Sequence, residues 1–214
     1  MSRIIKINPD NPDPNSLQDA AEIINAGGVI GYPTETVYGL GAGISNSSAV
    51  ERIFKIKGRD FNKALIVIVN SIEMLQPLVQ DMPPDAESLM NRFWPGPLTL
   101  VFKASPAVNP AISGGRTTIA IRIPDNRICL ELLSRCDGPI TSTSANIAGE
   151  PNSITAMEVE QKLGRWLDLI IDGGASKSSS ASTLLDLTTE LPKLRRKGAI
   201  PANEIERMIK IESE

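Results

Sequence analysis

Short apolar runs alternate with helical patterns along the whole chain, and this alternation is the feature that most limits the possible folds. Residues 65–69 form a continuous, largely β-branched apolar run of the kind found in strands buried on both faces. Just before it, Val50, Ile53 and Phe54 recur at helical spacing. Because strands and helices are mixed throughout, with at least six or seven strands, the sequence predicts an α/β fold.

The remaining elements are predicted from the same two patterns. Helices are predicted at residues 16–26, 47–57, 72–79, 85–93, 127–135, 155–163 and 202–211. Strands are predicted at residues 28–32, 65–69, 98–103, 117–123, 140–144, 169–171, 183–187 and 193–196. No internal repeat interrupts this order, and the one low-complexity stretch, residues 176–182, has the length of a loop. We therefore predict an N-terminal arm over residues 1–15 and a single domain over residues 16–214.

The complete absence of histidine restricts the chemistry that this chain can perform. It excludes a Ser-His-Asp triad, a Cys-His dyad, a histidine general base and every zinc site that contains histidine. The two cysteines cannot form a four-sulfur metal site, and we interpret Cys129 and Cys136 as small buried apolar residues. Any chemistry must therefore come from lysine, arginine, hydroxyl, amide or carboxylate groups, from backbone N–H groups, or from a borrowed metal ion.

The overall charge and hydropathy limit the partners of the protein. The formal net charge is −3, so any site for a polyanion must be a local patch. No apolar run approaches the roughly 18 residues of a membrane span, and the first residues lack the apolar core of a signal peptide. We expect a cytoplasmic protein that has reduced thiols and makes no contact with a membrane.

The segment from residue 32 to residue 41 follows a predicted strand and is rich in glycine and hydroxyl groups. Glycine lets a backbone approach a ligand closely, and Thr34 and Thr36 could hydrogen-bond a polar substrate. Its glycines do not match the G-x-G-x-x-G pattern, and the chain contains no P-loop motif. A strand and turn without any ligand is the alternative interpretation.

A group of basic residues ends the second predicted helix and continues into the loop after it: Lys55, Lys57, Arg59 and Lys63. Gly58 would turn the chain so that Lys57 and Arg59 converge on one anion, and arginine can bind two phosphate oxygens at once. The alternative is the mild stabilisation that cations commonly give to the C-terminus of a helix.

Hydroxyl and amide groups crowd residues 141–146. Alternate residues of an extended chain share a face, so Ser142, Ser144 and Asn146 would line the same face. Such a strand could emerge into a cleft, or it could lie exposed at the edge of a sheet. Near the C-terminus, residues 182–183 and 195–198 could complete an anion site or form solvated surface.

Six segments together resemble one known family. They are Tyr32-Pro-Thr-Glu-Thr-Val-Tyr-Gly-Leu, Lys57-Gly-Arg59, Trp94-Pro-Gly-Pro-Leu-Thr-Leu, Arg122-Ile-Pro, Ser142-Thr-Ser-Ala-Asn146 and Asp172-Gly-Gly. In this order, and over most of the chain, they resemble the YrdC-type threonylcarbamoyl-AMP synthases. The paired K-x-R and S-x-N signature of that family falls on Lys57 and Arg59 and on Ser144 and Asn146.

This resemblance implies a twisted, mixed α/β sheet flanked by helices, with a concave electropositive basin. It also implies that ATP, L-threonine and bicarbonate react to give threonylcarbamoyl-AMP, pyrophosphate and water, with Mg²⁺ assisting and without an organic cofactor. This reaction begins the N6-threonylcarbamoyl modification of adenosine 37 in tRNA. The implied partners are these three substrates and the downstream tRNA threonylcarbamoyl transferase proteins, with an RNA backbone as a further contact.

The resemblance further implies roles for individual residues. Lys57 and Arg59 would neutralise phosphate charge as pyrophosphate leaves, and Ser144 and Asn146 would hold phosphate or carbamate oxygens. The wider ATP-binding set is Lys55, Lys57, Arg59, Thr143, Ser144, Asn146, Ser182 and Arg196. The threonine-binding set is Tyr32, Thr34, Arg122 and Ser142. No protein ligand to a metal is predicted.

Two departures from the family pattern and three alternatives stay open. Many members carry a histidine near the threonine site where this chain has Ile68, and longer members have an additional C-terminal domain beyond the point that corresponds to Glu214. We therefore expect any closing lid to come from within the domain.

The alternatives are a YrdC-like paralogue without synthase activity, the related module of hydrogenase-maturation carbamoyltransferases, and a double-stranded RNA-binding module without catalysis.

Overall fold

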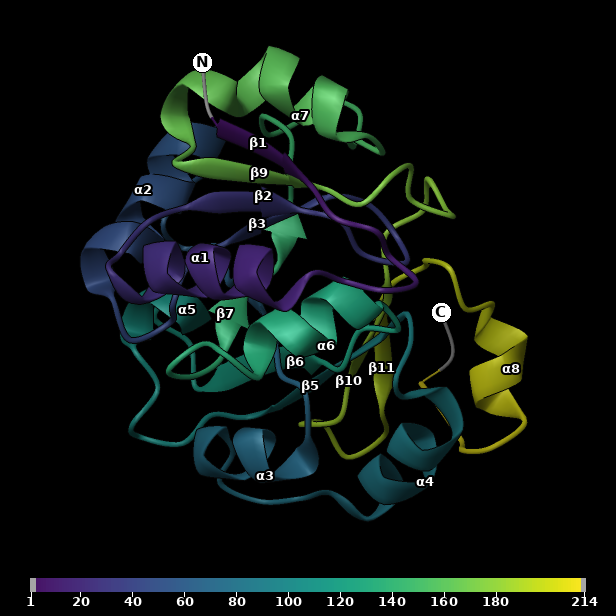
Figure 1. Cartoon of the computed structure of the whole chain (residues 1–214). Coiled ribbons are helices and arrows are strands. Elements are labelled where there is room, and N and C mark those ends of the chain that lie inside the picture. Colours follow the sequence, from purple (N-terminus) through teal and green to yellow (C-terminus); the bar gives the residue numbers. More distant parts are fainter. Residues whose placement is uncertain (1–2, 213–214) are drawn as a thin grey trace.

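The computed structural model describes residues 3–212 and divides their strands between two sheets (Figure 1). The strands are β1 (Arg3–Lys6), β2 (Ile30–Tyr32), β3 (Gly39–Gly41), β4 (Ile66–Ile68), β5 (Leu98–Lys103), β6 (Thr118–Arg122), β7 (Ile140–Thr141), β8 (Thr143–Ser144), β9 (Leu169–Asp172), β10 (Thr183–Asp186) and β11 (Lys193–Arg196). One sheet has the order β1-β9-β2-β3-β8, and the other has the order β11-β10-β5-β6-β4-β7. Both sheets mix parallel and antiparallel pairs, so the predicted mixed α/β fold is confirmed, but as two sheets rather than one.

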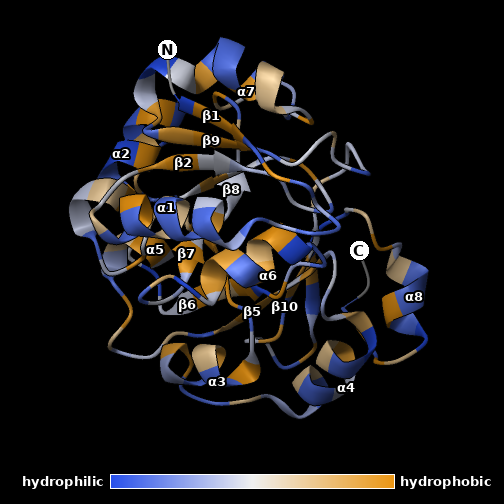
Figure 2. Ribbon diagram, in the orientation of Figure 1, coloured by the Kyte–Doolittle hydropathy of each residue, from blue (hydrophilic) through white to orange (hydrophobic). Residues whose placement is uncertain are grey.

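Helices flank both sheets. They are α1 (Pro14–Asn25), α2 (Ser47–Lys57), α3 (Ile72–Leu75), α4 (Pro84–Phe93), α5 (Pro110–Ser113), α6 (Arg127–Leu133), α7 (Ala156–Leu163) and α8 (Ala202–Glu206), with 3-10 turns η1 (Gln76–Leu78) and η2 (Gly164–Trp166). The longer helices are amphipathic, with apolar residues toward the sheets and polar residues outward (Figure 2). No helix in the described part of the chain is both long enough and apolar enough to cross a bilayer.

Two apolar clusters hold these layers together. In the smaller cluster, α1 and α6 pack against β2 and β9, and Cys129 lies fully buried there, as predicted for a small apolar residue. Burial raises the pKa of the Cys129 thiol, which donates a hydrogen bond to the carbonyl of Pro33 (3.0 Å). The larger cluster includes residues of α2, α4 and α7 together with strand residues from both sheets. Burial of apolar side chains is the main favourable contribution to the free energy of folding.

The N-terminal segment differs from the predicted arm in two ways. Residues 3–6 form β1, which pairs in parallel with β9, so they extend the five-stranded sheet. The first helix begins at Pro14 rather than at residue 16, because the carboxylate of Asp13 accepts a hydrogen bond from the N–H of Ser16 and Pro14 occupies the first helical position. Both positions favour the start of a helix.

The glycine-rich end of the segment after β2 is a strand rather than a turn. Gly39–Gly41 forms β3, antiparallel to β2, with Tyr32 opposite Gly39. A Cβ atom on Gly39 would lie 3.1 Å from the ring of Tyr32, and one on Gly41 would lie 2.8 Å from it. The two glycines therefore leave room for a buried aromatic ring.

The segment predicted as one strand over residues 140–144 changes sheets at Ser142. β7 pairs with β4 in the six-stranded sheet, whereas β8 pairs with β3 in the five-stranded sheet. Ser142 lies between them, and its N–H donates to the carbonyl of Ile66. This change of sheet brings the hydroxyl-rich segment to the junction of the two sheets.

Candidate functional site

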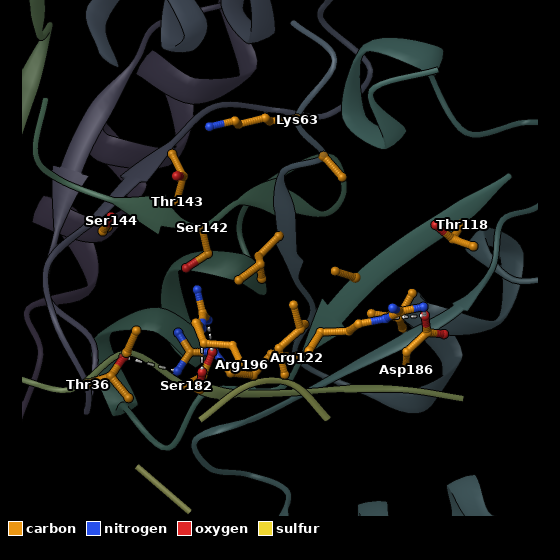
Figure 3. Close-up of a pocket in the computed structure, with 18 of the residues that line it drawn as sticks. Thr36, Lys63, Thr118, Arg122, Ser142, Thr143, Ser144, Ser182, Asp186 and Arg196 are labelled. Atoms are coloured by element: carbon orange, nitrogen blue, oxygen red, sulfur yellow. Dashed lines mark hydrogen bonds and ion pairs between the residues drawn. The ribbon is translucent and has the colours of Figure 1, made fainter. Parts of the chain in front are cut away.

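A cavity of about 1130 Å³ lies where the two sheets meet (Figure 3). The β2–β3 connection, the loop after α2, the 142–144 segment, and β6, β10 and β11 all contribute to its walls. In Figure 3, Arg122, Arg196 and Ser182 lie close together, while Thr118 and Asp186 lie toward the other end. These elements are far apart in the sequence, so the cavity exists only in the folded chain.

Cations dominate the charged groups that line this cavity. They are Arg59, Lys63, Arg116, Arg122, Arg195 and Arg196, against the single lining carboxylate of Asp186. Arg195 is paired with Asp186 (2.8 Å), and Arg122 is paired with Glu35 (2.7 Å), which lies behind the lining residues. Within the described part of the chain, the other four cations form no ion pair with a carboxylate. An anionic ligand would find four cations with no carboxylate partner here.

The arginines at the centre of the cavity are close enough to disfavour one another's charge. Burial, and then the nearby Arg116, lower the pKa of Arg59. Burial, and then Arg122 and Arg59, lower the pKa of Arg196. Like charges gathered in a partly buried cavity cost free energy, and a bound polyanion would offset that cost.

Three consecutive hydroxyl groups, those of Ser142, Thr143 and Ser144, line the cavity. Strict alternation along one strand predicts that only Ser142 and Ser144 share a face. The change of sheet at Ser142 breaks that alternation and also brings Thr143 to the cavity wall, where its hydroxyl accepts a hydrogen bond from Nη1 of Arg59 (3.4 Å). Asn146, predicted to share the face, is not among the lining residues.

Lys57 and Asn146 lie behind the cavity wall and organise it. Nζ of Lys57 donates to the carbonyls of Ser144 (2.5 Å) and Asn146 (2.9 Å) and to Oδ1 of Asn146 (3.2 Å). The hydroxyl of Ser144 donates to the same Oδ1 (2.5 Å). Only 3% of Lys57 is exposed, and burial, followed by the charge of Arg59, lowers its pKa to about 7. The geometry therefore makes Lys57 a support for the 144–146 turn rather than part of the cavity surface.

Three more predicted residues do not reach the cavity. Lys55 is exposed on α2 and lies outside the lining set. The hydroxyl of Tyr32 is buried and donates to the carbonyl of Thr141 (2.9 Å). Thr34 is buried, and its hydroxyl donates to the carbonyl of Val37 (2.7 Å). Tyr32 and Thr34 shape the β2–β3 connection, which presents Thr36 and Tyr38 to the cavity.

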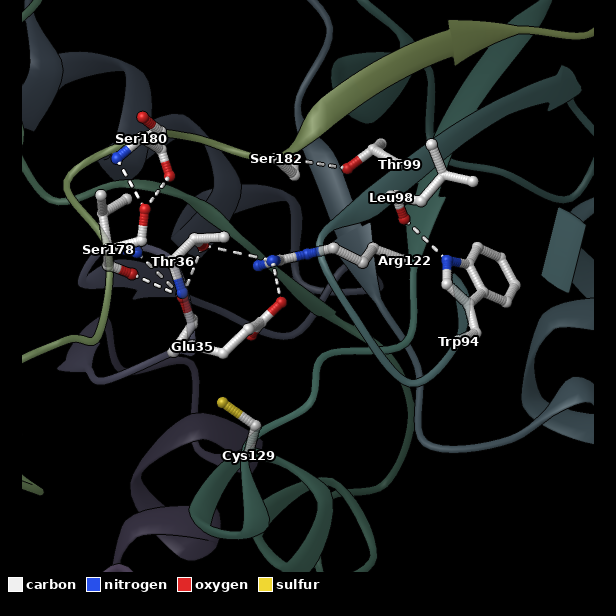
Figure 4. A network of polar contacts seen from close by, with 12 residues as sticks. Glu35, Thr36, Trp94, Leu98, Thr99, Arg122, Cys129, Ser178, Ser180 and Ser182 are labelled. Atoms are coloured by element: carbon white, nitrogen blue, oxygen red, sulfur yellow. Dashed lines mark hydrogen bonds and ion pairs between the residues drawn. The ribbon is translucent and has the colours of Figure 1, made fainter. Parts of the chain in front are cut away.

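The C-terminal pair of predicted residues does reach the cavity. Nε and Nη2 of Arg196 donate to the carbonyl and the hydroxyl of Ser182 (2.9 and 3.0 Å). That hydroxyl lies 2.7 Å from the hydroxyl of Thr99 (Figure 4). These contacts connect β11, β10 and β5 and hold the guanidinium of Arg196 at the wall.

Ile68 is fully buried, packs in the same apolar cluster as Tyr32 and Ile140, and lies outside the lining set. In the sheet it is the register partner of Arg122.

Sequence reasoning missed Arg116, Thr118 and Asp186 as cavity residues. Asp186 carried a usable signal, because a carboxylate in the otherwise apolar run of β10 needs a partner when it is buried. Arg195 supplies that partner through two hydrogen bonds. Arg116 stands just before a predicted strand, and only the fold brings it to the cavity.

The described residues contain no group of three or more aspartate, glutamate, cysteine or histidine residues that could hold a metal ion. The carboxylates of Asp186 and Glu35 are each engaged by an arginine.

The Sua5/YciO/YrdC family model, which carries the description "Telomere recombination", matches residues 22–198. The chain belongs to this family.

The threonylcarbamoyl-AMP synthase of Pyrococcus abyssi is 44% identical over 193 residues, which cover 90% of this chain and 57% of that protein. The threonylcarbamoyl-AMP synthase of Bacillus subtilis is 39% identical over 198 residues, which cover 92% of this chain and 57% of that protein. The chain thus spans less than two thirds of these two relatives. It covers 99% of the Vibrio vulnificus enzyme of the same name, at 36% identity over 186 residues and 86% of this chain.

Solved structures of family members have the same fold. P. abyssi Sua5 complexed with L-threonine superposes with a TM-score of 0.94 at 40% identity, over 99% of this chain and 63% of that chain. E. coli YciO superposes with a TM-score of 0.86 at 31% identity, over 94% of this chain and 98% of that chain. A HypF structure matches at 17% identity with a TM-score of 0.75, a likeness of fold alone.

Proposed function

We propose that this family member is a threonylcarbamoyl-AMP synthase. One observation carries the proposal: four cations that have no carboxylate partner in the described part of the chain share one cavity with Arg122 and with three neighbouring hydroxyl groups. Such a cavity suits a polyphosphate together with a small carboxylate. The names of the relatives, and the structure of one of them with L-threonine, support the same assignment.

The proposed reaction suits a chain without histidine, because the substrate supplies the nucleophile. The amine of threonine attacks CO₂ derived from bicarbonate, which gives a carbamate and releases a proton. A carbamate oxygen then attacks the α-phosphorus of ATP as the bond to pyrophosphate breaks. The protein has to position these groups and stabilise the charge that develops on the phosphates.

The cavity residues divide into two proposed groups. Arg59, Lys63 and Arg196 would neutralise the phosphates, and the hydroxyls of residues 142–144 would hold phosphate or carbamate oxygens. Arg122 would bind the threonine carboxylate, because its planar guanidinium matches a carboxylate in geometry. Lys57 and Asn146 would act from behind, by fixing the backbone that carries Ser144.

We propose that Mg²⁺ enters with ATP and is held mainly by phosphate oxygens and water, as is common for this ion. Threonylcarbamoyl-AMP would then pass to tRNA threonylcarbamoyl transferase proteins, which would transfer its threonylcarbamoyl group to N6 of adenosine 37 and release AMP. Ile68 would lie beneath the threonine-binding region rather than in contact with the amino acid, since it is buried away from the cavity surface.

Product formation tests the proposal directly. The protein would be incubated with ATP, L-threonine, bicarbonate and Mg²⁺, and threonylcarbamoyl-AMP would be detected by liquid chromatography and mass spectrometry. We expect product that depends on both threonine and bicarbonate. Absence of product from the folded protein would overturn the proposal. Tight, salt-sensitive binding of double-stranded RNA without product would instead favour the RNA-binding alternative.

A further inference from the structure

Glu35 lies behind the cavity wall and forms a buried ion pair with Arg122 (Figure 4). Its Oε1 accepts a hydrogen bond from Nη1 of Arg122 (2.7 Å), and the same Nη1 donates to the hydroxyl of Thr36 (3.2 Å). The side chains of Arg122 and Glu35 are only 4% and 9% exposed. A charge this deeply buried needs an opposite charge beside it, so Glu35 and Arg122 act as a unit.

The pair is held at one point and leaves polar atoms unused. Oε2 of Glu35 and Nε of Arg122 are buried and have no hydrogen-bond partner among the residues that the structure describes. Arg122 lines the cavity, whereas Glu35 does not. A guanidinium has five N–H donors, so a single strong contact with Glu35 leaves donors for a ligand in the cavity.

A second pair in the cavity has a different geometry. Asp186 accepts from both Nε (3.0 Å) and Nη2 (2.8 Å) of Arg195, and its other oxygen accepts from Thr188. That carboxylate is satisfied on both sides. The cavity thus holds two arginines that are paired with a carboxylate, Arg122 and Arg195, and four cations without a carboxylate partner among the described residues.

This division matters because the two proposed anionic substrates could compete for the same cations. Triphosphate carries several negative charges and is attracted to every cation within reach, whereas an amino-acid carboxylate carries one. A fixed carboxylate beside Arg122 cancels most of its attraction for a polyphosphate. It leaves the planar N–H donors that a single carboxylate can use.

We propose that Glu35 is a positioning and selectivity residue that reserves Arg122 for the carboxylate of threonine and leaves the phosphates of ATP to the four cations without a carboxylate partner. The proposal rests on the proposed function, since it takes threonine and ATP as the substrates. It assigns to Glu35 no contact with a substrate, only an effect through Arg122.

Binding measurements without turnover test this proposal. Isothermal titration calorimetry would give the dissociation constant of L-threonine with and without saturating pyrophosphate, for the wild type and for Glu35→Gln. The glutamine keeps the shape and an acceptor oxygen but removes the charge. We expect pyrophosphate to change the threonine dissociation constant less than twofold in the wild type and to raise it at least tenfold in Glu35→Gln.

Two further variants separate charge from structure. Glu35→Asp keeps the charge on a shorter side chain, so threonine should bind more weakly while pyrophosphate still fails to compete. Glu131→Gln removes the charge from an exposed ion pair with Arg127 (2.8 Å) and should behave as the wild type does. Equal effects of pyrophosphate in the wild type and Glu35→Gln would overturn the proposal, as would competition in Glu35→Asp.

This test separates failure of the selectivity proposal from failure of the proposed function. If the expected competition pattern is found but the wild type makes no threonylcarbamoyl-AMP, then the synthase assignment fails and the role of Glu35 stands. If the wild type makes product but the charge of Glu35 does not affect competition, then the role of Glu35 fails alone.

Discussion

Lys57 and Arg59 are only two residues apart, yet their surroundings are opposite. Lys57 ends helix α2, is almost fully buried and donates three hydrogen bonds to the 144–146 turn. Arg59 lies in the following loop, lines the cavity and makes no ion pair with any carboxylate in the described part of the chain. One cation supports the wall, and the other forms its surface.

Gly58 causes this division. It ends α2 in the left-handed conformation (φ 57°), which strongly favours glycine. A Cβ atom there would meet no other atom within 4 Å, so the backbone conformation, and not a lack of space, requires glycine. The K-x-R signature therefore contains two basic residues with different positions: Lys57 supports the cavity wall from behind, and Arg59 lines the cavity.

The largest expected effect comes from removing the surface cation. We expect Arg59→Ala to lower kcat/KM for ATP by about 100- to 1000-fold, the usual cost of losing one preorganised group that stabilises developing charge. The free energy of unfolding should change by only about 1 kcal/mol, because its two protein hydrogen bonds are lost together with the side chain. Threonine-dependent pyrophosphate release and urea unfolding measure these quantities. Near wild-type kcat/KM would contradict the assignment of Arg59 to the phosphates.

Lys57 should act chiefly through stability. We expect Lys57→Met to lower the free energy of unfolding by about 2–3 kcal/mol, because acceptors at Ser144 and Asn146 lose their buried donor. Lys55→Met is the matched control on the same helix. Lys55 is exposed, so its replacement should change the free energy of unfolding by less than about 0.5 kcal/mol. Equal urea midpoints for the two variants would show that Lys57 does not support the turn.

The lowered pKa of Lys57 should make the free energy of unfolding depend on pH. Burial lowers its pKa to about 7 in the folded protein, whereas the ordinary value of 10.5 applies to the unfolded chain. Between these values the unfolded state binds more protons, so the contribution of Lys57 to the free energy of unfolding increases with pH, by up to about 1.4 kcal/mol per pH unit. Urea unfolding at pH 7.5 and at pH 9 should therefore show a steeper increase for the wild type than for Lys57→Met. Parallel slopes would contradict the lowered pKa.

The smallest effect is expected at Tyr32. Its hydroxyl donates to the carbonyl of Thr141 and lies away from the cavity surface, so Tyr32→Phe should cost about 1 kcal/mol of stability. The KM for threonine should stay within twofold of the wild-type value in a steady-state assay. A tenfold increase in that KM would support the prediction from sequence that Tyr32 contacts the substrate.

Secondary structure was predictable wherever local patterns decide it. Helix α2 and strands β5 and β11 have the predicted bounds, because local residue patterns define all three and Gly58 ends α2. Strand β1 was missed because its exposed residues pair only with β9, which is more than 160 positions away. Strand β3 was missed because its glycines indicate a loop until the ring of Tyr32 is placed against them.

The predicted site residues also fall into two groups, those that line the cavity and those that lie behind its wall. Arg59, Arg122, Ser142, Ser144 and Arg196 line the cavity. Their contacts with substrates stay a prediction. Lys57, Asn146, Thr34 and Tyr32 lie behind the wall, and no spacing along the chain distinguishes a residue that faces a cavity from one that supports it.

The sequence by itself determined the α/β class, most element positions and the exclusion of histidine-based chemistry, because these follow from composition and from local periodicity. The tertiary structure alone decided that the strands form two sheets and that the chain changes sheet at Ser142. It also decided that Arg122 is partnered by Glu35, while Arg59 and Arg196 have no carboxylate partner among residues 3–212. The physical reason is that exposure and charge pairing depend on neighbours that meet only after folding, from positions as far apart as residues 35 and 122.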